Sequence, residues 1–390
     1  MSPDTLARAG RPGRLAGLTL RNRVIKSATY EGMSPSGVAS DALVHHHQRL
    51  AKGGVGMTTV AYCAVSAEGR TFGDQLQLSE ASLPVLRRLT AAVHAEGAAA
   101  SLQLGHCGGF SKLGRPRGPS RVLNRYGAAS GRLWVTPMDE GDLTRTIDAF
   151  ASSAHTARDL GFDAVELHLG HGYLLSQFLS PLTNRRRDRW GGPLENRMRL
   201  PLAVVDAVRA RVGADFPIVA KVNLRDGCAG GLTLEESVVL AQHLEARGVD
   251  ALVLSGGLVS HNAFYLLRGE SPARAMAAVE PNWLQKSAIA LLGPLMLRSP
   301  PFTELFFYED ACQVREAVEM PLVLLGGVVS SQNVAKAMEA GFDYVAAGRA
   351  LLADPDWAQK VLRDGEAHSR CTHCNLCIAE MDRDGVRCVL

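Results

Sequence analysis

Polar side chains that can bind or polarise a ligand occur at the ends of several short apolar runs in this sequence. The imidazoles of His168 and His171 can donate N–H groups to an oxygen that gains negative charge during a reaction. Lys221 adds a cationic donor, and the amide of Gln103 can both donate and accept hydrogen bonds. The whole set comprises Gln103, His106, His168, His171, Lys221, Asn223, Ser255, Gly326, Gly327, Gly348 and Arg349. Any one of these residues alone is more often structural, whereas their joint placement points to a single site.

Two glycine-containing segments have the composition of a phosphate-binding site. They are LLGG at 324–327 and AAGRA at 346–350. Glycine lets backbone N–H groups approach an anion closely, and a guanidinium can bind phosphate oxygens in a bidentate manner. The glycines have a plainer explanation as tight turns, but that explanation gives Arg349 no function. The segments therefore predict a phosphate site formed by Gly326, Gly327, Gly348 and Arg349.

Four cysteines crowd the C-terminus with the spacing C-x2-C-x2-C-x10-C. They are Cys371, Cys374, Cys377 and Cys388, whereas the other four cysteines are scattered singly along the chain. This asymmetry indicates a local metal site and not a framework of disulfides. Four thiolates at such spacing suit an iron–sulfur cluster or a structural zinc ion. Reduced cysteines without metal are the third alternative.

The elements that would position these residues are eight short apolar runs without polar alternation. Such runs are typical of strands that are buried on both faces of a parallel sheet. They lie at 24–29, 56–62, 100–106, 164–171, 217–223, 251–257, 321–327 and 344–350. Amphipathic stretches of helical period separate many of them, at 83–97, 143–161, 200–213, 234–248 and 334–341.

Eight strands alternating with helices predict an α/β fold, and they favour a closed (β/α)8 TIM barrel over an open doubly wound sheet. In such a barrel the active site forms at the C-terminal ends of the strands, which gathers the polar residues at one mouth. Two longer segments, 107–137 and 258–320, follow strand ends and are expected to form lids and pocket walls. The sequence has no GxGxxG after a strand and no GxxxxGK[ST], so neither a Rossmann domain nor a P-loop is predicted.

Composition narrows the class of protein. Hydrophobic residues make up 46% and charged residues 21% of 390 residues, which fits a soluble globular protein with a large core. A net charge of +3 gives no reason to expect a nucleic-acid or membrane-surface partner. The longest apolar run, at 288–297, is about half of the roughly 20 residues that cross a bilayer. Without a secretory signal, we expect a cytoplasmic protein that acts on a small molecule.

The segment ELHLGHGYLLSQFLSPLTNRRRDRWGGPLENRMRL at 166–200 closely resembles the signature segment of the old yellow enzyme family of NAD(P)H-dependent flavin oxidoreductases. Three further segments are similar to corresponding parts of that family: RNRVIKSAT at 21–29, LQLGHCGG at 102–109 and GGVVSSQNVAKAMEAGFDYVAAGRALLADPDW at 326–357. The resemblance thus covers most of the chain and reinforces the barrel prediction.

The resemblance implies FMN held noncovalently at the barrel mouth, with NAD(P)H as co-substrate. Gln103 would contact the pyrimidine edge of the flavin, and Lys221 would lie near flavin N1, where its charge stabilises the reduced ring. Ser27, Ala28 and Thr29 would lie along the ring. The phosphate would lie against Gly326, Gly327, Gly348 and Arg349.

The resemblance also implies the reaction. His168 and His171 match the family's pair of donors to a substrate carbonyl oxygen, and Tyr173 matches its proton donor to the α-carbon. The expected activity is reduction of the C=C bond of an electron-poor alkene, an α,β-unsaturated carbonyl compound, by hydride transfer from flavin N5 and protonation by Tyr173. A packing role for Tyr173 and a metal-binding role for the two histidines are the less favoured alternatives.

Two departures from the family pattern touch the cofactor environment. Tyr30 replaces a small residue that contacts the flavin in many members, which makes Tyr30 a candidate substrate-binding residue alongside His168 and His171. Cys107 and Gly109 replace a common alanine and arginine. Members of the family often self-associate, so a homo-oligomer is one expected state.

The cysteine tail resembles the cluster segment of larger relatives such as 2,4-dienoyl-CoA reductase and trimethylamine dehydrogenase, with shorter spacing in two places. We therefore expect one domain at 1–365, the FMN-binding barrel, and a Cys-rich tail at 366–390 that packs on it. The tail would hold a [4Fe–4S] cluster, or zinc, through Cys371, Cys374, Cys377 and Cys388.

Three alternatives compete with an ene-reductase. The runner-up is an amine dehydrogenase-like or dienoyl-CoA reductase-like enzyme that passes electrons through an iron–sulfur cluster to a partner. A second is a phosphate-binding isomerase or lyase barrel without a redox cofactor, and a third is a protein that only binds its ligand. The pair His168 and His171 together with Tyr173 favours the ene-reductase, because amine oxidation has less use for two donors to a carbonyl oxygen.

Overall fold

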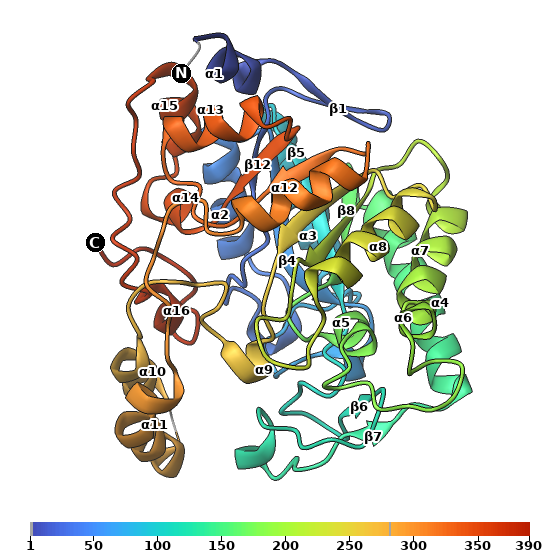
Figure 1. Cartoon of the computed structure of the whole chain (residues 1–390). Helices are drawn as coiled ribbons and strands as arrows, with labels where there is room; N and C mark the ends of the chain where they lie inside the picture. Colours follow the sequence, from blue (N-terminus) through green and yellow to red (C-terminus); the bar gives the residue numbers. More distant parts are fainter. Residues whose placement is uncertain (1–2, 281) are drawn as a thin grey trace.

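The computed structural model, which describes residues 3–280 and 282–390, contains a closed barrel of eight parallel strands (Figure 1). Hydrogen-bonded neighbours run in the order β10, β11, β12, β3, β4, β5, β8, β9, and β9 closes the ring on β10. The barrel strands are β3 Val24–Lys26, β4 Met57–Ala64, β5 Ala99–Gly105, β8 Ala164–Leu169, β9 Ile218–Asn223, β10 Ala251–Ser255, β11 Leu322–Leu324 and β12 Tyr344–Ala347. Every strand lies within or beside one of the eight predicted runs. The predicted TIM barrel is confirmed.

The apolar runs become strands because each is buried on both faces. Every residue of β4, β5, β8, β9 and β10 is buried. Side chains on one face of the strands fill the barrel interior, among them Ile25, Met57 and Val253. Those on the other face pack under the helices. This double burial explains why the strands show no polar alternation.

The helices form the outer layer of the barrel. They include α2 Asp41–Lys52, α3 Leu83–Ala95, α4 Glu140–Asp159, α7 Arg199–Val212, α8 Leu234–Glu245, α12 Tyr308–Ala317 and α13 Ser331–Glu339. Capping boxes start three of them, at Asp139, Thr233 and Ser330. Helix α4 therefore begins at Glu140, three residues before the apolar pattern starts, because the Asp139 carboxylate accepts the N–H of Asp142.

The N-terminal segment closes the end of the barrel opposite the C-terminal ends of its strands. Helix α1 Pro3–Gly10 precedes a hairpin of β1 Gly13–Leu15 and β2 Leu18–Leu20. Leu15 and Leu20 are buried against the barrel interior, where the hydroxyl of Tyr344 donates to the carbonyl of Arg14 at 2.8 Å. Figure 1 shows this hairpin at the top and the β6–β7 loop at the opposite end.

The two long segments predicted to form lids contain short elements. Residues 107–137 hold β6 Arg117–Gly118, η3 Ala128–Ser130 and β7 Thr136–Pro137, and residues 258–320 hold α9 Val259–Asn262, α10 Ala273–Val279, α11 Trp283–Met296 and α12. Helices α10 and α11 lie side by side below the barrel in Figure 1. The remaining elements are η1 Pro35–Gly37, η2 Ala67–Gly69, α5 Leu174–Leu179, α6 Leu194–Arg197, α14 Arg349–Ala353, α15 Trp357–Arg363 and α16 Cys377–Glu380. In the described part of the chain, no helix has the length and apolarity that a membrane span requires.

The cysteine tail lies against the barrel along its length. The N–H of Ser369 donates to the carbonyl of Val329 at 2.7 Å, and the N–H of Val386 donates to the carbonyl of Glu31 at 2.6 Å. A Cβ on Gly32 would lie 2.2 Å from the carbonyl oxygen of Met381, so only glycine allows this approach. The tail is therefore in contact with the loop that follows β3.

Candidate functional site

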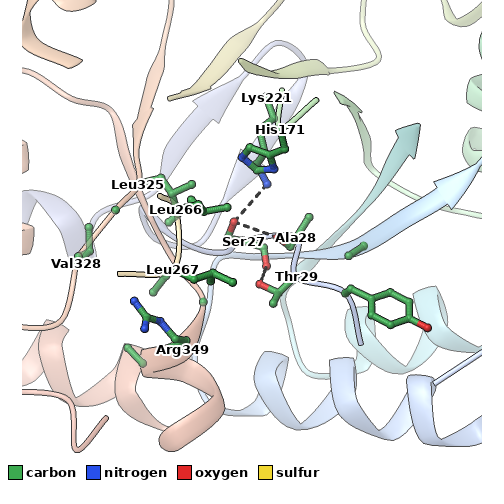
Figure 2. Close-up of a pocket in the computed structure, with 18 of the residues that line it drawn as sticks. Ser27, Ala28, Thr29, His171, Lys221, Leu266, Leu267, Leu325, Val328 and Arg349 are labelled. Carbon is green, nitrogen blue, oxygen red and sulfur yellow. Dashed lines mark hydrogen bonds between the residues drawn. The ribbon is translucent and has the colours of Figure 1, made fainter. Parts of the chain in front are cut away.

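A cavity of about 260 Å³ opens at the C-terminal ends of the barrel strands. It is lined by all thirteen of the predicted cofactor-binding, substrate-binding and catalytic residues, namely Ser27, Ala28, Thr29, Tyr30, Gln103, His168, His171, Tyr173, Lys221, Gly326, Gly327, Gly348 and Arg349. Figure 2 shows side chains from the segment after β3, from β9 and from the start of α14 around the same space. Closure of the barrel thus brings together residues that are as far as 322 positions apart, from Ser27 to Arg349.

A buried carboxylate organises one wall of this cavity. Glu166 Oε1 lies 2.9 Å from Lys221 Nζ and accepts a hydrogen bond of 2.6 Å from Gln103 Nε2. Lys221 Nζ also donates to Ser27 Oγ at 3.3 Å, which Figure 2 draws as a dashed line. Glu166 therefore holds two of the predicted flavin-contacting side chains in place, and its own charge is compensated.

A second buried ion pair holds the loop after β3. Lys26 Nζ lies 2.7 Å from Glu31 Oε1, and His47 Nε2 lies 3.3 Å from the same oxygen. Burial raises the pKa of the Glu31 carboxyl, but Lys26 and His47 outweigh that effect and bring it down to about 2. Glu31 is thus ionised at neutral pH and fixes the end of the segment that carries Ser27 to Tyr30.

The predicted donor pair lies beside the predicted proton donor. The rings of His168 and His171 are 4.9 Å apart and nearly perpendicular, and the ring of Tyr173 lies 4.7 Å from that of His168. Burial lowers the pKa of His168 well below its ordinary value, and burial with the charge of Lys221 lowers the pKa of His171 to about 3. Both imidazoles are therefore neutral at neutral pH.

The neutral state determines which nitrogen of His168 carries the proton. Nδ1 of His168 accepts the N–H of Gly170 at 3.4 Å, so Nε2 holds the hydrogen and is a donor. His171 differs, because its Nε2 lies 2.7 Å from Ser255 Oγ. The backbone of His171 has a positive φ of 60°, and its N–H donates to Asn223 Oδ1 at 3.0 Å. The Asn223 amide thereby stabilises an unusual conformation that turns the imidazole toward the cavity wall.

Tyr173 begins helix α5 in an aromatic environment. Its ring lies 4.9 Å from Tyr62 and 5.8 Å from Phe110. Burial raises the pKa of the Tyr173 phenol above its ordinary value of about 10. The hydroxyl is therefore protonated throughout the physiological pH range and can act only as a donor to a strong base.

The predicted phosphate end of the cavity is built on two glycines with positive φ and one arginine. Gly326 and Gly327 have φ values of 101° and 75°, where side chains are disfavoured. Burial lowers the pKa of Arg349, whose Nη1 donates to the carbonyl of Arg268 at 2.8 Å and to Asn375 Oδ1 at 2.6 Å. Among the described residues, no hydrogen-bond partner is found for its Nε or Nη2, which leaves the three N–H groups of these two nitrogens for a ligand.

The four tail cysteines line a separate small cavity together with Arg349 and Asn375. All four are free thiols. Burial raises the pKa of Cys377 to about 11, against the opposing charge of Arg349. Arg349 lines both cavities, so the cysteine cavity directly adjoins the predicted phosphate end of the larger one.

Several lining residues escaped the sequence analysis. Tyr62, Phe302, His373 and Met381 line the large cavity, and the ring of Phe302 stacks on that of His373 at 3.3 Å. Nothing in the sequence places the tail over the barrel mouth. Glu166 did carry a signal, because a carboxylate inside a strand buried on both faces requires a cation nearby.

The donors and walls of the large cavity fit FMN. Backbone N–H groups at positive-φ glycines and the free donors of Arg349 suit a phosphate, while Lys221 and Gln103 suit the polar edge of a flavin. Apolar side chains such as Ala28, Leu266 and Leu325 supply flat contact for an aromatic ring. The cavity therefore provides a cationic end, a polar edge and apolar walls in one space.

Comparison with known proteins agrees with this chemistry. The model of the NADH:flavin oxidoreductase / NADH oxidase family matches residues 11–265. The chain is 43% identical over 384 residues to 4,4'-dithiodibutanoate disulfide reductase of Rhodococcus erythropolis, covering 97% of this chain and 94% of that protein. It is 31% identical to the metal reductase of Desulforamulus reducens, covering 93% of this chain but only 50% of that protein.

Similarity to solved structures supports the fold. The old yellow enzyme homologue of Zymomonas mobilis superposes with a TM-score of 0.72 at 19% identity, covering 94% of this chain and 95% of that one. At this level of identity the likeness shows a shared barrel and no more. The chain is therefore comparable in length to some relatives and spans about half of others, such as the metal reductase.

Proposed function

The chain belongs to the NADH:flavin oxidoreductase / NADH oxidase family, and from that membership we propose that it uses FMN and NAD(P)H to reduce the C=C bond of α,β-unsaturated carbonyl compounds. The resemblance to the old yellow enzyme family is thereby confirmed at the level of family and of flavin oxidoreductase activity. We propose an α,β-unsaturated carbonyl compound as the substrate because of the geometry of His168, His171 and Tyr173.

When bound, FMN supplies the redox chemistry, because it accepts hydride from NAD(P)H and donates it to the second substrate. Ser27, Ala28, Thr29, Gln103 and Lys221 would hold the ring system. Gly326, Gly327, Gly348 and Arg349 would bind the phosphate. The ion pair of Lys221 with Glu166 keeps the ammonium beside the ring without leaving it as an isolated buried charge.

His168 would activate the substrate carbonyl by donating a hydrogen bond to its oxygen. Its Nε2–H is a donor because Nδ1 accepts the Gly170 N–H and burial keeps the ring neutral. A donor of this kind lowers the energy of the negative charge that develops on a carbonyl oxygen. His171 would supply the second donor after its ring exchanges the Ser255 contact for the substrate. Tyr30, which lines the same cavity, would contact the substrate.

Tyr173 would deliver the proton that completes the reduction. Its phenol is fully protonated and its ring lies beside His168. The proton goes to the carbon α to the carbonyl, where an enolate is basic enough to take it. Because the pKa of Tyr173 is raised, its phenol is a weak acid and does not protonate neutral molecules in the cavity.

Disulfide reduction is a second candidate, because the relative that shares 43% identity over 97% of this chain is named a disulfide reductase. Reduction of a disulfide to two thiols takes two electrons and two protons, which one NAD(P)H and one solvent proton supply. The same cavity would serve, with the sulfur atoms in the position of the alkene.

We also propose that the tail holds a [4Fe–4S] cluster. In the described part of the chain, the only group of three or more ligand atoms within 4.8 Å of one another is Glu31, His46 and His47, so no three of the tail sulfurs lie that close together. A tetrahedral zinc site with bonds of about 2.3 Å requires sulfurs roughly 3.8 Å apart. The C-x2-C-x2-C-x10-C spacing of the tail suits a cluster, through which an amine dehydrogenase-like or dienoyl-CoA reductase-like enzyme would pass electrons to a partner.

An anaerobic absorption spectrum tests these proposals together. The purified holoenzyme receives NADPH or NADH, then 2-cyclohexenone or 4,4'-dithiodibutanoate, with iron and zinc assayed on the same sample. Bleaching of the flavin by a coenzyme and its recovery with the enone supports the ene-reductase, and recovery with the disulfide alone supports the second candidate. A yellow protein that neither coenzyme reduces would overturn both.

A further inference from the structure

A second cavity lies beside the first on the same mouth of the barrel. It is lined by Gly109, Phe110, Pro119, Val122, Leu123, Asn124, Arg125, Val135, Gly172, Gln177, Leu182, Thr183, Arg185, Ser260 and His261. The two cavities share their separating walls. Gly172 lines the second cavity while His171 and Tyr173 line the first, and Ser260 and His261 line the second while Val259 lines the first. Residues that are adjacent in the sequence thus line the two cavities, which are next to each other.

The lining of this second cavity is basic. Arg125, Arg185 and His261 are part of it, and none of its lining residues is acidic. Residues 107–137, which form one of its walls, contain six basic residues and no aspartate or glutamate. The positive charge of this cavity comes from Arg125 and Arg185, because burial and the charge of Arg125 lower the pKa of His261.

The two guanidinium groups lack the partners that neighbouring arginines have. Arg186 pairs with Asp188 at 2.6 Å, and Arg189 pairs with Glu140 at 2.9 Å. Within residues 3–280 and 282–390, no acidic group or carbonyl is found hydrogen-bonded to the side chain of Arg125 or Arg185. Five N–H donors on each are therefore available to an incoming anion.

Buried hydrogen bonds and ring contacts join the walls of this second cavity. Gln177 is buried and links both walls, because its Nε2 donates to the carbonyls of Cys107 and Gly172 while its Oε1 accepts the N–H of Gly109 at 2.8 Å. Phe110 stacks on Tyr126 at 4.1 Å and contacts Tyr173 at its edge. Through Phe110, these contacts connect the loop that carries Arg125 to Tyr173.

We propose that this second cavity binds an anionic group, a carboxylate or a phosphate, of a molecule whose reactive end lies in the first cavity. Arg125 and Arg185 would hold the anion and thereby select charged substrates over neutral ones. This inference rests on the proposed function for the identity of the reactive end. The anion has two sources, the substrate or the phosphates of the coenzyme, which enter the site in separate steps.

Direct binding tests the proposal without turnover. Calorimetry measures the Kd of 4-oxopent-2-enoate and of its methyl ester on the oxidised holoenzyme, for the wild type and for Arg125→Gln/Arg185→Gln. Loss of charge-assisted hydrogen bonds is expected to weaken binding of the acid by about ten- to hundredfold, and binding of the ester by less than about twofold. Arg187→Gln is the matched control, because Arg187 is an exposed arginine of the same run that does not line the cavity.

The two half-reactions identify the source of the anion. Weaker binding of the acid with unchanged flavin reduction by NADPH and NADH supports an anionic substrate. Slower flavin reduction with unchanged binding of the acid supports the coenzyme phosphates. If the double variant matches the wild type in both measurements, the cavity is not an anion site. Failure of the proposed function has a different signature, because the wild-type flavin would then not be reduced by either coenzyme.

Discussion

Lys221 and Glu166 form an ion pair of 2.9 Å inside the barrel, with side chains that are 1% and 4% exposed. Both side chains are almost completely buried, so each charge is compensated mainly by the other. The same carboxylate orients Gln103, which makes Glu166 the residue that positions both predicted contacts to the flavin edge. Tyr173, the buried His106 and the cysteine tail are the other features whose roles substitutions can test.

Substitution Glu166→Gln is expected to lower the free energy of unfolding by about 3–5 kcal/mol, because it leaves the Lys221 ammonium buried without its partner. Urea unfolding of the holoenzyme measures this change, and the flavin content of the purified protein reports the loss of binding. Glu366→Gln, at an exposed position, is the matched control. The double variant Glu166→Gln/Lys221→Met removes both charges and should recover much of the loss; if it does not, the ion pair is not the cause.

Substitution Tyr173→Phe separates proton delivery from hydride transfer. Turnover of 2-cyclohexenone is expected to fall by about 10²–10⁴-fold, a typical contribution of a positioned acid, while flavin reduction by NADPH stays within about twofold. Stopped-flow absorbance resolves the two half-reactions. Tyr126→Phe is the control, because Tyr126 stacks on Phe110 outside the first cavity. Unchanged turnover in Tyr173→Phe would mean that the phenol only packs.

The buried histidines make stability depend on pH. Burial lowers the pKa of His106 to about 4, whereas the unfolded chain has a pKa near 6.5. Between these values the unfolded state binds a proton that the folded state does not, so stability falls as the pH drops from about 6.5 to about 4, by roughly 1.4 kcal/mol per pH unit.

Substitution His106→Asn tests this linkage, because asparagine keeps an acceptor for the Gly108 N–H that His106 Nδ1 now accepts at 3.0 Å. The free energy of unfolding, measured between pH 7 and pH 4.5, should have a shallower slope in the variant by about that amount. His155→Asn, on the surface of α4, should keep the wild-type slope. Equal slopes in the wild type and His106→Asn would show that folding does not lower the pKa of His106.

Substitution Cys374→Ser tests the cluster. Iron is expected to fall from about four atoms per chain to less than one, while the flavin content is retained, because the cysteine cavity is separate from the first cavity. Elemental analysis and the visible spectrum measure both. Cys312→Ser, in helix α12, should change neither. One zinc atom per chain in the wild type, with no iron, would replace the cluster by a structural zinc site.

The barrel followed from the residue pattern, and the lining of its first cavity followed partly from the polar strand ends and partly from the resemblance to the old yellow enzyme family. Eight apolar runs identified the strands because burial on both faces leaves no polar positions, and the polar residues at their ends had to meet because parallel strands point their C-terminal ends the same way. Lys221 and Arg349 could be assigned to one site on this ground, whereas Ser27 was assigned through the resemblance to the old yellow enzyme family. Helix limits were less accurate, as at α4, because a cap such as Asp139 lies outside the apolar pattern.

Only the tertiary structure decided the contacts that depend on how loops cross the barrel mouth. Three such arrangements join segments without a shared periodicity. They are the ion pair of Glu166 with Lys221, the position of His373 at the first cavity, and the presence of Arg125 and Arg185 in the lining of the second cavity. The sequence determined which chemistry is present, since strand burial and residue type are local properties. Distances between segments decide which charged groups pair with each other and which charged groups stay available to a ligand. No local sequence pattern encodes these distances.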